Sequence, residues 1–334
     1  MAPRRNIRKP SQRSASVALQ TAGKLAGIGG VALVGQLVYV AVTTPRLPPP
    51  EKSGHAFDLN GILVQYDNED IKNGSLDNSE PLTEEFNLVL VGDSPVEGIG
   101  CRYHKDSMGG QTALAFSRTL NSRPVRYWSF GKSGLTAAGI QSNMCPLMKK
   151  ISASRRIDAI VISCGVNNVL SNHSAGRFRK EVETLLDSIS ANFDVENEIG
   201  ACKPIIIVMG ILDFSYMPFL PWPLSSVLGW RSRCLQREME AVIEERQKHQ
   251  ALSVSSGEND CNLTIAKIPP FGDILSGLRN DLLPDIKKND LSKLCLNDFF
   301  ANDGFHPAKY GTTAVGHLLA LSYMKLCQGS IMKT

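Results

Sequence analysis

Features that are typical of several functional classes are missing from this sequence. No Cys-x-x-Cys pair occurs among its eight cysteines, and because metal clusters commonly use that spacing, no metal site is predicted. Residues 1–50 contain seven basic residues and no acidic one, which leaves 29 basic and 32 acidic residues in the rest of the chain. A nucleic-acid binder carries its positive charge on the folded body, so neither DNA nor RNA is expected as a partner. The 334 residues, 43% hydrophobic and 20% charged, have the composition of a folded globular chain.

The first 54 residues differ in composition from the rest. Residues 25–42 carry no charge and follow six basic residues, and as a helix they would span about 27 Å, just enough for a bilayer core of roughly 30 Å. Three interpretations are open: a membrane anchor with the body on the lumenal or extracellular side, a mitochondrial or plastid presequence, or an apolar helix packed on the body. We favour the anchor because the stretch is apolar on every face, whereas presequences are amphipathic. Prolines then predict a stiff spacer: Pro45, Pro48, Pro49 and Pro50.

The remaining residues, 55–334, are expected to form one domain with an irregular start. Short apolar runs predict five strands over residues 87–91, 125–129, 159–164, 204–209 and 263–268. Runs of helical period lie between and after them, over residues 111–120, 136–151, 177–192, 231–249 and 307–326. Strands that are apolar on both faces and separated by helices are typical of a parallel sheet covered on both sides. The pattern predicts a three-layer α/β fold whose reactive groups gather at the carboxyl ends of the strands.

Four segments at these strand ends carry groups suited to acyl transfer. Ser94 follows the first strand, Gly134 the second and Asn167 the third, while Asp303 and His306 precede the last helix. Singly, each has an ordinary structural explanation, such as a turn, a flexible loop or a helix cap. Asp303 and His306 are three residues apart, so one helical turn would place the carboxylate beside the imidazole. Together the four segments supply a hydroxyl nucleophile, a histidine with its carboxylate, and amide donors for an oxyanion.

These segments resemble, in order and spacing, the SGNH hydrolases, also called GDSL esterases and lipases. The resemblance covers residues 87–325 and lies in four blocks: Gly92-Asp93-Ser94, Gly134, Gly165-x-Asn167 and Asp303-x-x-His306. It implies a flavodoxin-like α/β/α sandwich with a five-stranded parallel sheet, and an enzyme that needs no cofactor.

The resemblance also implies roles for individual residues. Ser94 would be the nucleophile, His306 the general base and then acid, and Asp303 its orienting carboxylate. The backbone amides of Ser94 and Gly134 and the side-chain amide of Asn167 would form the oxyanion hole.

Two positions depart from the family pattern. Asn168 stands where an aspartate is common, and because that position is outside the triad we expect altered loop bonding with the chemistry retained. Pro95 directly follows the nucleophile and removes one backbone donor, but the amide that the mechanism needs belongs to Ser94 itself.

An apolar, proline-interrupted segment spans residues 214–230. It could form a lid, an acyl-chain channel, a surface that dips into a membrane, or a second small core cluster. Its aromatic residues are the predicted substrate contacts: Phe214, Tyr216, Phe219 and Trp222.

The sequence therefore predicts a membrane-tethered serine esterase that forms an acyl-enzyme, with an acyl lipid or lysophospholipid as the favoured substrate. The alternatives within enzymes are a carbohydrate O-acetylesterase and an O-acyltransferase on the same triad. A non-catalytic lipid- or glycan-binding module is the alternative from another class.

Overall fold

The computed structural model describes residues 85–331 apart from 154, 194–202, 254–261, 270–272, 275–279 and 292, together with shorter stretches between residues 33 and 66. Most of residues 25–42, and with them the predicted anchor, lie outside the described residues. Within the described part of the chain, no helix is long and apolar enough to cross a membrane.

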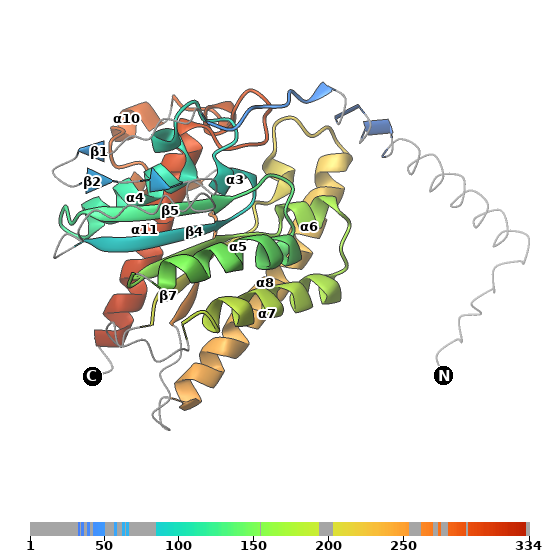
Figure 1. Cartoon of the computed structure of the whole chain (residues 1–334). Helices are drawn as coiled ribbons and strands as arrows, with labels where there is room; N and C mark the ends of the chain where they lie inside the picture. The colour runs from blue at the N-terminus through green and yellow to red at the C-terminus, as the bar shows by residue number, and fades with distance from the viewer. Residues whose placement is uncertain are drawn as a thin grey trace, which may run out of the picture.

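A sheet of six parallel strands forms the centre of the molecule, in the order β3-β5-β4-β6-β7-β8 (Figure 1). Five of them are the predicted strands: β4 (Phe86–Gly92), β5 (Val125–Gly131), β6 (Ala159–Ser163), β7 (Ile205–Met209) and β8 (Leu263–Ala266). The sixth, β3 (Gln65–Tyr66), adds two residues at one edge, in a segment expected to be irregular. A separate antiparallel pair joins β1 (Phe57–Asp58) and β2 (Ile62–Leu63). The three-layer α/β prediction is confirmed.

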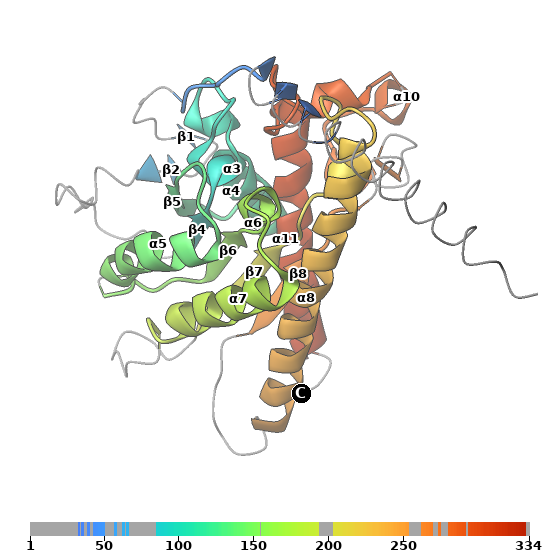
Figure 2. The same cartoon turned by 90° about the vertical axis from the view of Figure 1, so that its right-hand side faces the viewer.

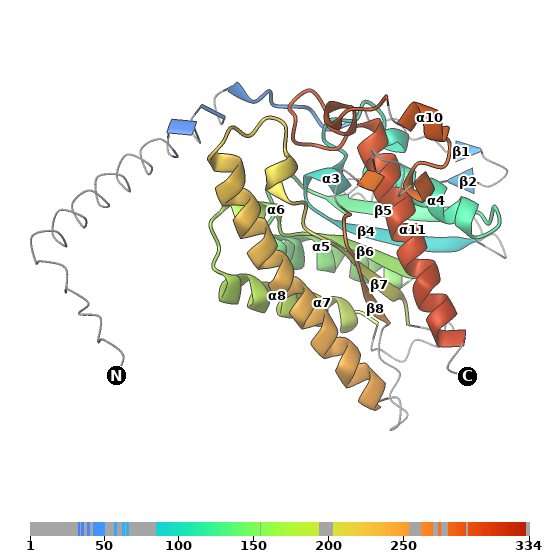
Figure 3. The same ribbon diagram turned by 180° about the vertical axis from the view of Figure 1, so that it is seen from behind.

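Helices cover both faces of the sheet. The helices α5 (Ala137–Ser152), α7 (Ala175–Ser190) and α8 (Leu224–Ser253) pack together on one side, and α4 (Met108–Thr119) and α11 (Lys309–Ile331) pack together on the other (Figures 1 and 3). The helix expected from residue 231 begins seven residues earlier, directly after the prolines that interrupt the aromatic segment. Residues 224–230 are therefore helical, whereas we expected a loop.

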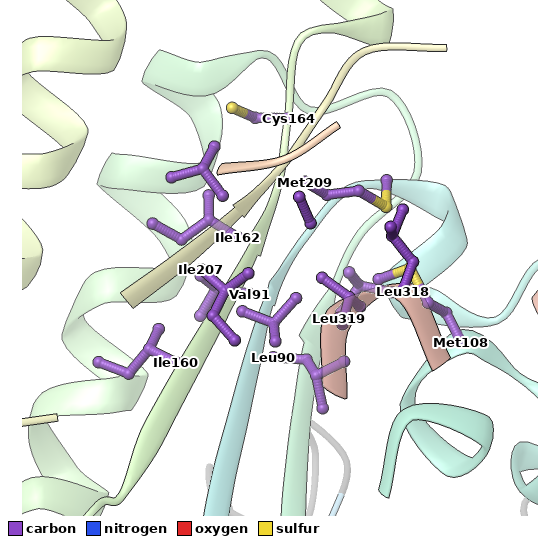
Figure 4. Close-up of a cluster of buried hydrophobic side chains, with 14 of the residues drawn as sticks. Leu90, Val91, Met108, Ile160, Ile162, Cys164, Ile207, Met209, Leu318 and Leu319 are labelled. Carbon is purple, nitrogen blue, oxygen red and sulfur yellow. The ribbon is translucent and has the colours of Figure 1, made fainter. Parts of the chain in front are cut away.

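Helix caps place the helix starts at the carboxyl end of the sheet. Ser107 begins α4, Thr136 begins α5 and Ser174 begins α7, each by accepting a hydrogen bond from a backbone amide of the first turn. The strands β4, β5 and β6 are buried on both faces and form a continuous apolar core with the helices, part of which is drawn in Figure 4. The loops between strand ends and helix starts thus converge on one edge of a rigid core.

The N-terminal segment also contacts this edge. The side-chain amide of Gln36 donates to Trp222 O at 2.9 Å, and its oxygen accepts from Leu224 N at 3.2 Å. Further along, Pro50 is buried, and the segment that contains it crosses the same end of the molecule as α3 (Ser94–Glu97) (Figures 1 and 2). The described part of the leader therefore contacts the domain at Trp222 and Leu224.

Candidate active site

Ser94 stands on a sharp turn between strand and helix. It is the first residue of α3, directly after β4, and is 4% exposed. The turn needs the small Gly92, because a Cβ there would lie 2.7 Å from Ser163 O. The first amides of a helix have no partner within the helix, so the Ser94 N–H points out of the helix start, where an anion can be bound. The predicted nucleophile therefore combines a fixed backbone with an available donor.

Asp303 and His306 form a close pair. His306 Nδ1 lies 2.5 Å from Asp303 Oδ2, while Asp303 Oδ1 accepts from the amides of Phe305 and His306 at 2.9 and 3.0 Å. Burial alone would raise the pKa of Asp303, but the hydrogen bonds from the imidazole and the two amides outweigh it and lower the pKa. The carboxylate is thus held charged and fixes the orientation of the ring.

Asp303 and His306 are in contact as predicted, but the backbone that carries them is not the predicted helical turn. Asp303 and His306 lie in a turn, where the carboxylate binds the amides two and three residues on, and not in a helix. Pro307 pairs with Phe300 in an isolated β-bridge, and α11 begins only at Lys309. The proline was expected to open that helix.

The structure brings the nucleophile loop and the histidine loop together without joining Ser94 to His306. A Cβ on Gly100, in the loop after α3, would lie 3.4 Å from His306 Cβ. Among the described residues, no hydrogen bond links the Ser94 hydroxyl to the imidazole. Such bonds are often long in unliganded enzymes and shorten when substrate binds, so the predicted triad would be completed only when Ser94 and His306 move into contact.

The predicted oxyanion donors lie in the neighbouring loops. Gly134 has a φ of +83°, which favours glycine, and nothing lies within 4 Å of the position where a Cβ would be. Asn167 Nδ2 donates to Asp93 Oδ2 at 3.1 Å and to Leu135 O at 3.0 Å. Both hydrogens of this amide are therefore engaged in the unliganded structure, and one must be released to bind an oxyanion.

Asp93 is a buried carboxyl group beside the nucleophile that the sequence analysis did not single out. It is fully buried and accepts from Ser163 Oγ at 3.0 Å as well as from Asn167. Burial raises the pKa of Asp93 to about 7, against the lowering effect of these hydrogen bonds and of His306. Asp93 thus connects the nucleophile turn to the oxyanion loop.

The amide of Asn168 binds three elements at once. Its oxygen accepts from Ala137 N at 3.0 Å, and its nitrogen lies 2.6 Å from Glu181 Oε2 and 2.9 Å from His173 Nδ1. The carboxylate of an aspartate at this position could not donate a hydrogen bond to Glu181 of α7. The asparagine amide can, which explains how residue 168 binds this carboxylate. This is the altered loop bonding expected from the departure at residue 168.

The family follows from comparison with known proteins. The model of the family described as GDSL-like Lipase/Acylhydrolase matches residues 88–319, well over half of the chain. The chain belongs to this family. It is therefore a hydrolase of ester bonds. A comparison with curated protein sequences gave no match.

Solved structures of esterases and lipases are similar in fold to this GDSL-like hydrolase. Est24, a carbohydrate acetylesterase from Sinorhizobium meliloti, is 14% identical with a TM-score of 0.45, over 72% of this chain and 99% of that one. The lipase Lip_vut3 from a goat rumen metagenome is 15% identical with a TM-score of 0.46, over 71% and 97%. A family 3 carbohydrate esterase of Clostridium thermocellum is 15% identical with a TM-score of 0.45, over 74% and 98%.

The aromatic segment of the hydrolase divides into buried and exposed parts. The rings of Phe214 and Phe219 pack against Phe305, the residue before the histidine, with ring centroids 6.0 and 5.6 Å apart. Phe214 is completely buried, so in this structure it supports the histidine loop from the core. Tyr216 and Trp222 are exposed, Trp222 by 78%. Of the four predicted substrate contacts, Tyr216 and Trp222 are therefore exposed, Phe219 is half-buried and Phe214 is buried.

An apolar cavity of about 90 Å³ lies under the strand ends of the hydrolase. The family name spells Gly-Asp-Ser-Leu, and here the fourth position is Pro95, which lines the cavity. A proline ring folds back on its own backbone and reaches less far than a leucine side chain, so this departure leaves room in the cavity.

The leader supplies a contact at the site that the sequence did not indicate. Leu47 Cδ1 lies 3.2 Å from the position that a Cβ on Gly100 would take, and Ala301 Cβ and His306 Cβ lie 3.0 and 3.4 Å from the same position. Within the described residues, no group of three or more histidine, cysteine or acidic side chains is placed to hold a metal ion. The six described cysteines are free thiols.

Proposed function

We propose that this hydrolase cleaves carboxylic esters with Ser94 as nucleophile, His306 as general base and Asp303 as orienting carboxylate. The observation that carries the proposal is the short contact between Asp303 and His306, with the other carboxylate oxygen bound to two backbone amides. A histidine held in this way can activate the hydroxyl of a serine at a helix start once the two side chains meet.

The reaction has two steps. In the first, His306 takes the hydroxyl proton as Ser94 Oγ bonds to the ester carbonyl carbon; the bond to the alcohol oxygen then breaks, and the proton passes to the leaving alcohol. Water next gives a proton to His306, attacks the acyl-enzyme and releases the acid and free serine. The amides of Ser94, Gly134 and Asn167 would stabilise the oxyanion in both steps. An alcohol in place of water would make the enzyme an O-acyltransferase.

The alcohol half of the ester has two candidates. Exposed aromatic side chains beside the site, Tyr216, Trp222 and Trp230, suit a lipid or another amphiphile. An open groove of about 640 Å³ between α5 and α7, whose lining includes Gln141, Arg177 and Glu181, offers hydrogen-bonding groups to a carbohydrate. It is also lined by Ala138, four residues after Gly134. An amphiphilic ester is our first candidate and a carbohydrate O-acyl ester the second.

The leader supports a membrane location for the first candidate. We propose that residues 25–42 anchor the chain, with the body on the lumenal or extracellular side. Extraction with alkaline carbonate should leave an anchored protein with the membranes. A shortened N-terminus on protein from mitochondria or plastids would contradict the anchor and favour a presequence.

A fluorophosphonate probe tests the triad. It should label the wild-type protein and the control variant Ser142→Ala, whose hydroxyl is on the surface of α5, but not Ser94→Ala. His306→Ala should label at least a thousandfold more slowly. Folded wild-type protein that neither reacts with the probe nor hydrolyses any ester would refute the proposal and favour a non-catalytic binding module.

A further inference from the structure

The apolar cavity is lined by residues from the same segments of the chain that carry the proposed reacting groups. Its walls include Pro95, Val166 and Pro307, which are the sequence neighbours of the proposed nucleophile, oxyanion amide and base. Each of these three residues is one position along the chain from a proposed reacting residue, so the cavity shares three segments of the chain with the proposed site. Met108, Met209 and Leu318 form part of its inner wall and lie close together in Figure 4. Segments at the ends of four strands, β4, β6, β7 and β8, and the start of α11 thus line one space.

The side chains that line the cavity determine which kind of chemical group can bind there. None of its sixteen described lining residues has a charged or polar side chain. A sugar hydroxyl, a phosphate or a water molecule would find no side-chain hydrogen-bond partner there, and such cavities stay dry. A hydrocarbon chain gains contact with every wall and loses no hydrogen bond. Of the two halves of an ester, a simple acyl chain fits this description.

The volume sets the length of that chain. An apolar cavity of about 150 Å³ takes up benzene, which has six carbons. At about 90 Å³, the cavity here has room for about four carbons in the same proportion. The core around it is closely packed, and lengthening the cavity would require moving side chains such as Met209 and Leu318, which are both buried.

We propose that this cavity is the acyl pocket of the enzyme and that it accepts acyl groups of about four carbons or fewer. The inference rests on the proposed esterase function and specifies its substrate: an acetyl to butanoyl ester. The fatty chain of a lysophospholipid exceeds the pocket. An amphiphilic substrate would therefore carry its apolar part on the alcohol half, toward the exposed aromatic residues.

A series of nitrophenyl esters from acetate to decanoate measures the limit. Wild-type kcat/KM should be highest at four carbons or fewer and fall about tenfold or more by octanoate, because a single methylene in an apolar pocket already changes it by that amount. Pro95→Leu, which adds bulk to the pocket, should lower the ratio of butanoate to acetate about tenfold. Leu318→Ala and the half-buried Leu212→Ala, which remove bulk, should raise the ratio of octanoate to butanoate by a similar factor.

Leu319→Ala is the matched control. Leu319 is the next residue of α11, is equally buried and does not line the cavity, so this variant should lose stability without changing either ratio. A wild-type preference for octanoate or decanoate, or ratios that Pro95→Leu and the two enlarging variants leave unchanged, would overturn the acyl pocket while the esterase function stands. Absence of both hydrolysis and fluorophosphonate labelling would refute the esterase function itself.

Discussion

The buried carboxyl group of Asp93 gives the sharpest test of the site's electrostatics. The substitution Asp93→Asn removes its charge and can keep both of its hydrogen bonds. The new amide oxygen accepts from Asn167, and the new amide nitrogen donates to Ser163, whose hydroxyl can also accept. The variant therefore isolates the cost of placing a charge at this position.

The expected magnitude follows from the pKa of Asp93, which burial raises from 3.8 to about 7. The folded state then keeps a proton that the unfolded state loses above pH 4, so the wild-type protein loses stability as the pH rises from about 4 to 7. A difference of about three pKa units corresponds to roughly 4 kcal/mol. Asp93→Asn lacks this loss, so its free energy of unfolding relative to wild type should rise by most of that amount between pH 4 and pH 8.

Urea unfolding of both proteins at pH 4, 6 and 8 measures the effect. Ser163→Ala is the matched companion, because it removes one hydrogen bond to the carboxylate without removing the charge. Its destabilisation should grow with pH to about 2 kcal/mol as the acceptor becomes charged. A difference between wild type and Asp93→Asn that is the same at all three pH values would refute the reasoning.

Three further substitutions test the support around the site. Glu85→Gln leaves the buried guanidinium of Arg126 without its carboxylate, and urea unfolding should show a loss of about 3 kcal/mol; a loss below 1 kcal/mol would contradict a desolvated pair. Asp303→Asn should lower kcat about 10³- to 10⁴-fold with a near-native melting temperature, and unchanged kcat would remove Asp303 from the triad. Phe305→Leu removes the ring that contacts His306 and should lower kcat tenfold or more at constant KM, whereas Phe305→Tyr should retain it.

The layers of the fold could be predicted because each strand buries both faces. A strand such as β6, with five consecutive buried residues, has a sequence that is apolar without alternation, and only a covered parallel sheet accommodates it. The edge strand β3 was not predicted because two residues are too few to show a hydrophobic pattern typical of a strand. The start of α8 at Leu224 was missed for a related reason: prolines mark where a helix cannot continue, but a helix can begin directly after them.

The candidate site was predictable only in its residue types. The sequence predicted that Asp303 and His306 lie side by side, but it attributed this to a helical turn. In the structure, a turn stabilised by the Asp303 carboxylate brings the two side chains together. The roles of Asp93 and Phe305 could not be found in the sequence. Their importance comes from burial and from a ring contact, and both depend on which loops the sheet brings together.

The sequence by itself determined the three-layer architecture, the family, and the set of groups available for ester hydrolysis, because these depend on local period and on short motifs. The tertiary structure alone decided that Asp93 is desolvated, that Leu47 of the leader lies beside His306's loop, and that an apolar cavity of about 90 Å³ is lined by the residue that follows Ser94. The physical reason is that burial, pKa and cavity volume are properties of segments distant in sequence that meet in space, and no single segment encodes them.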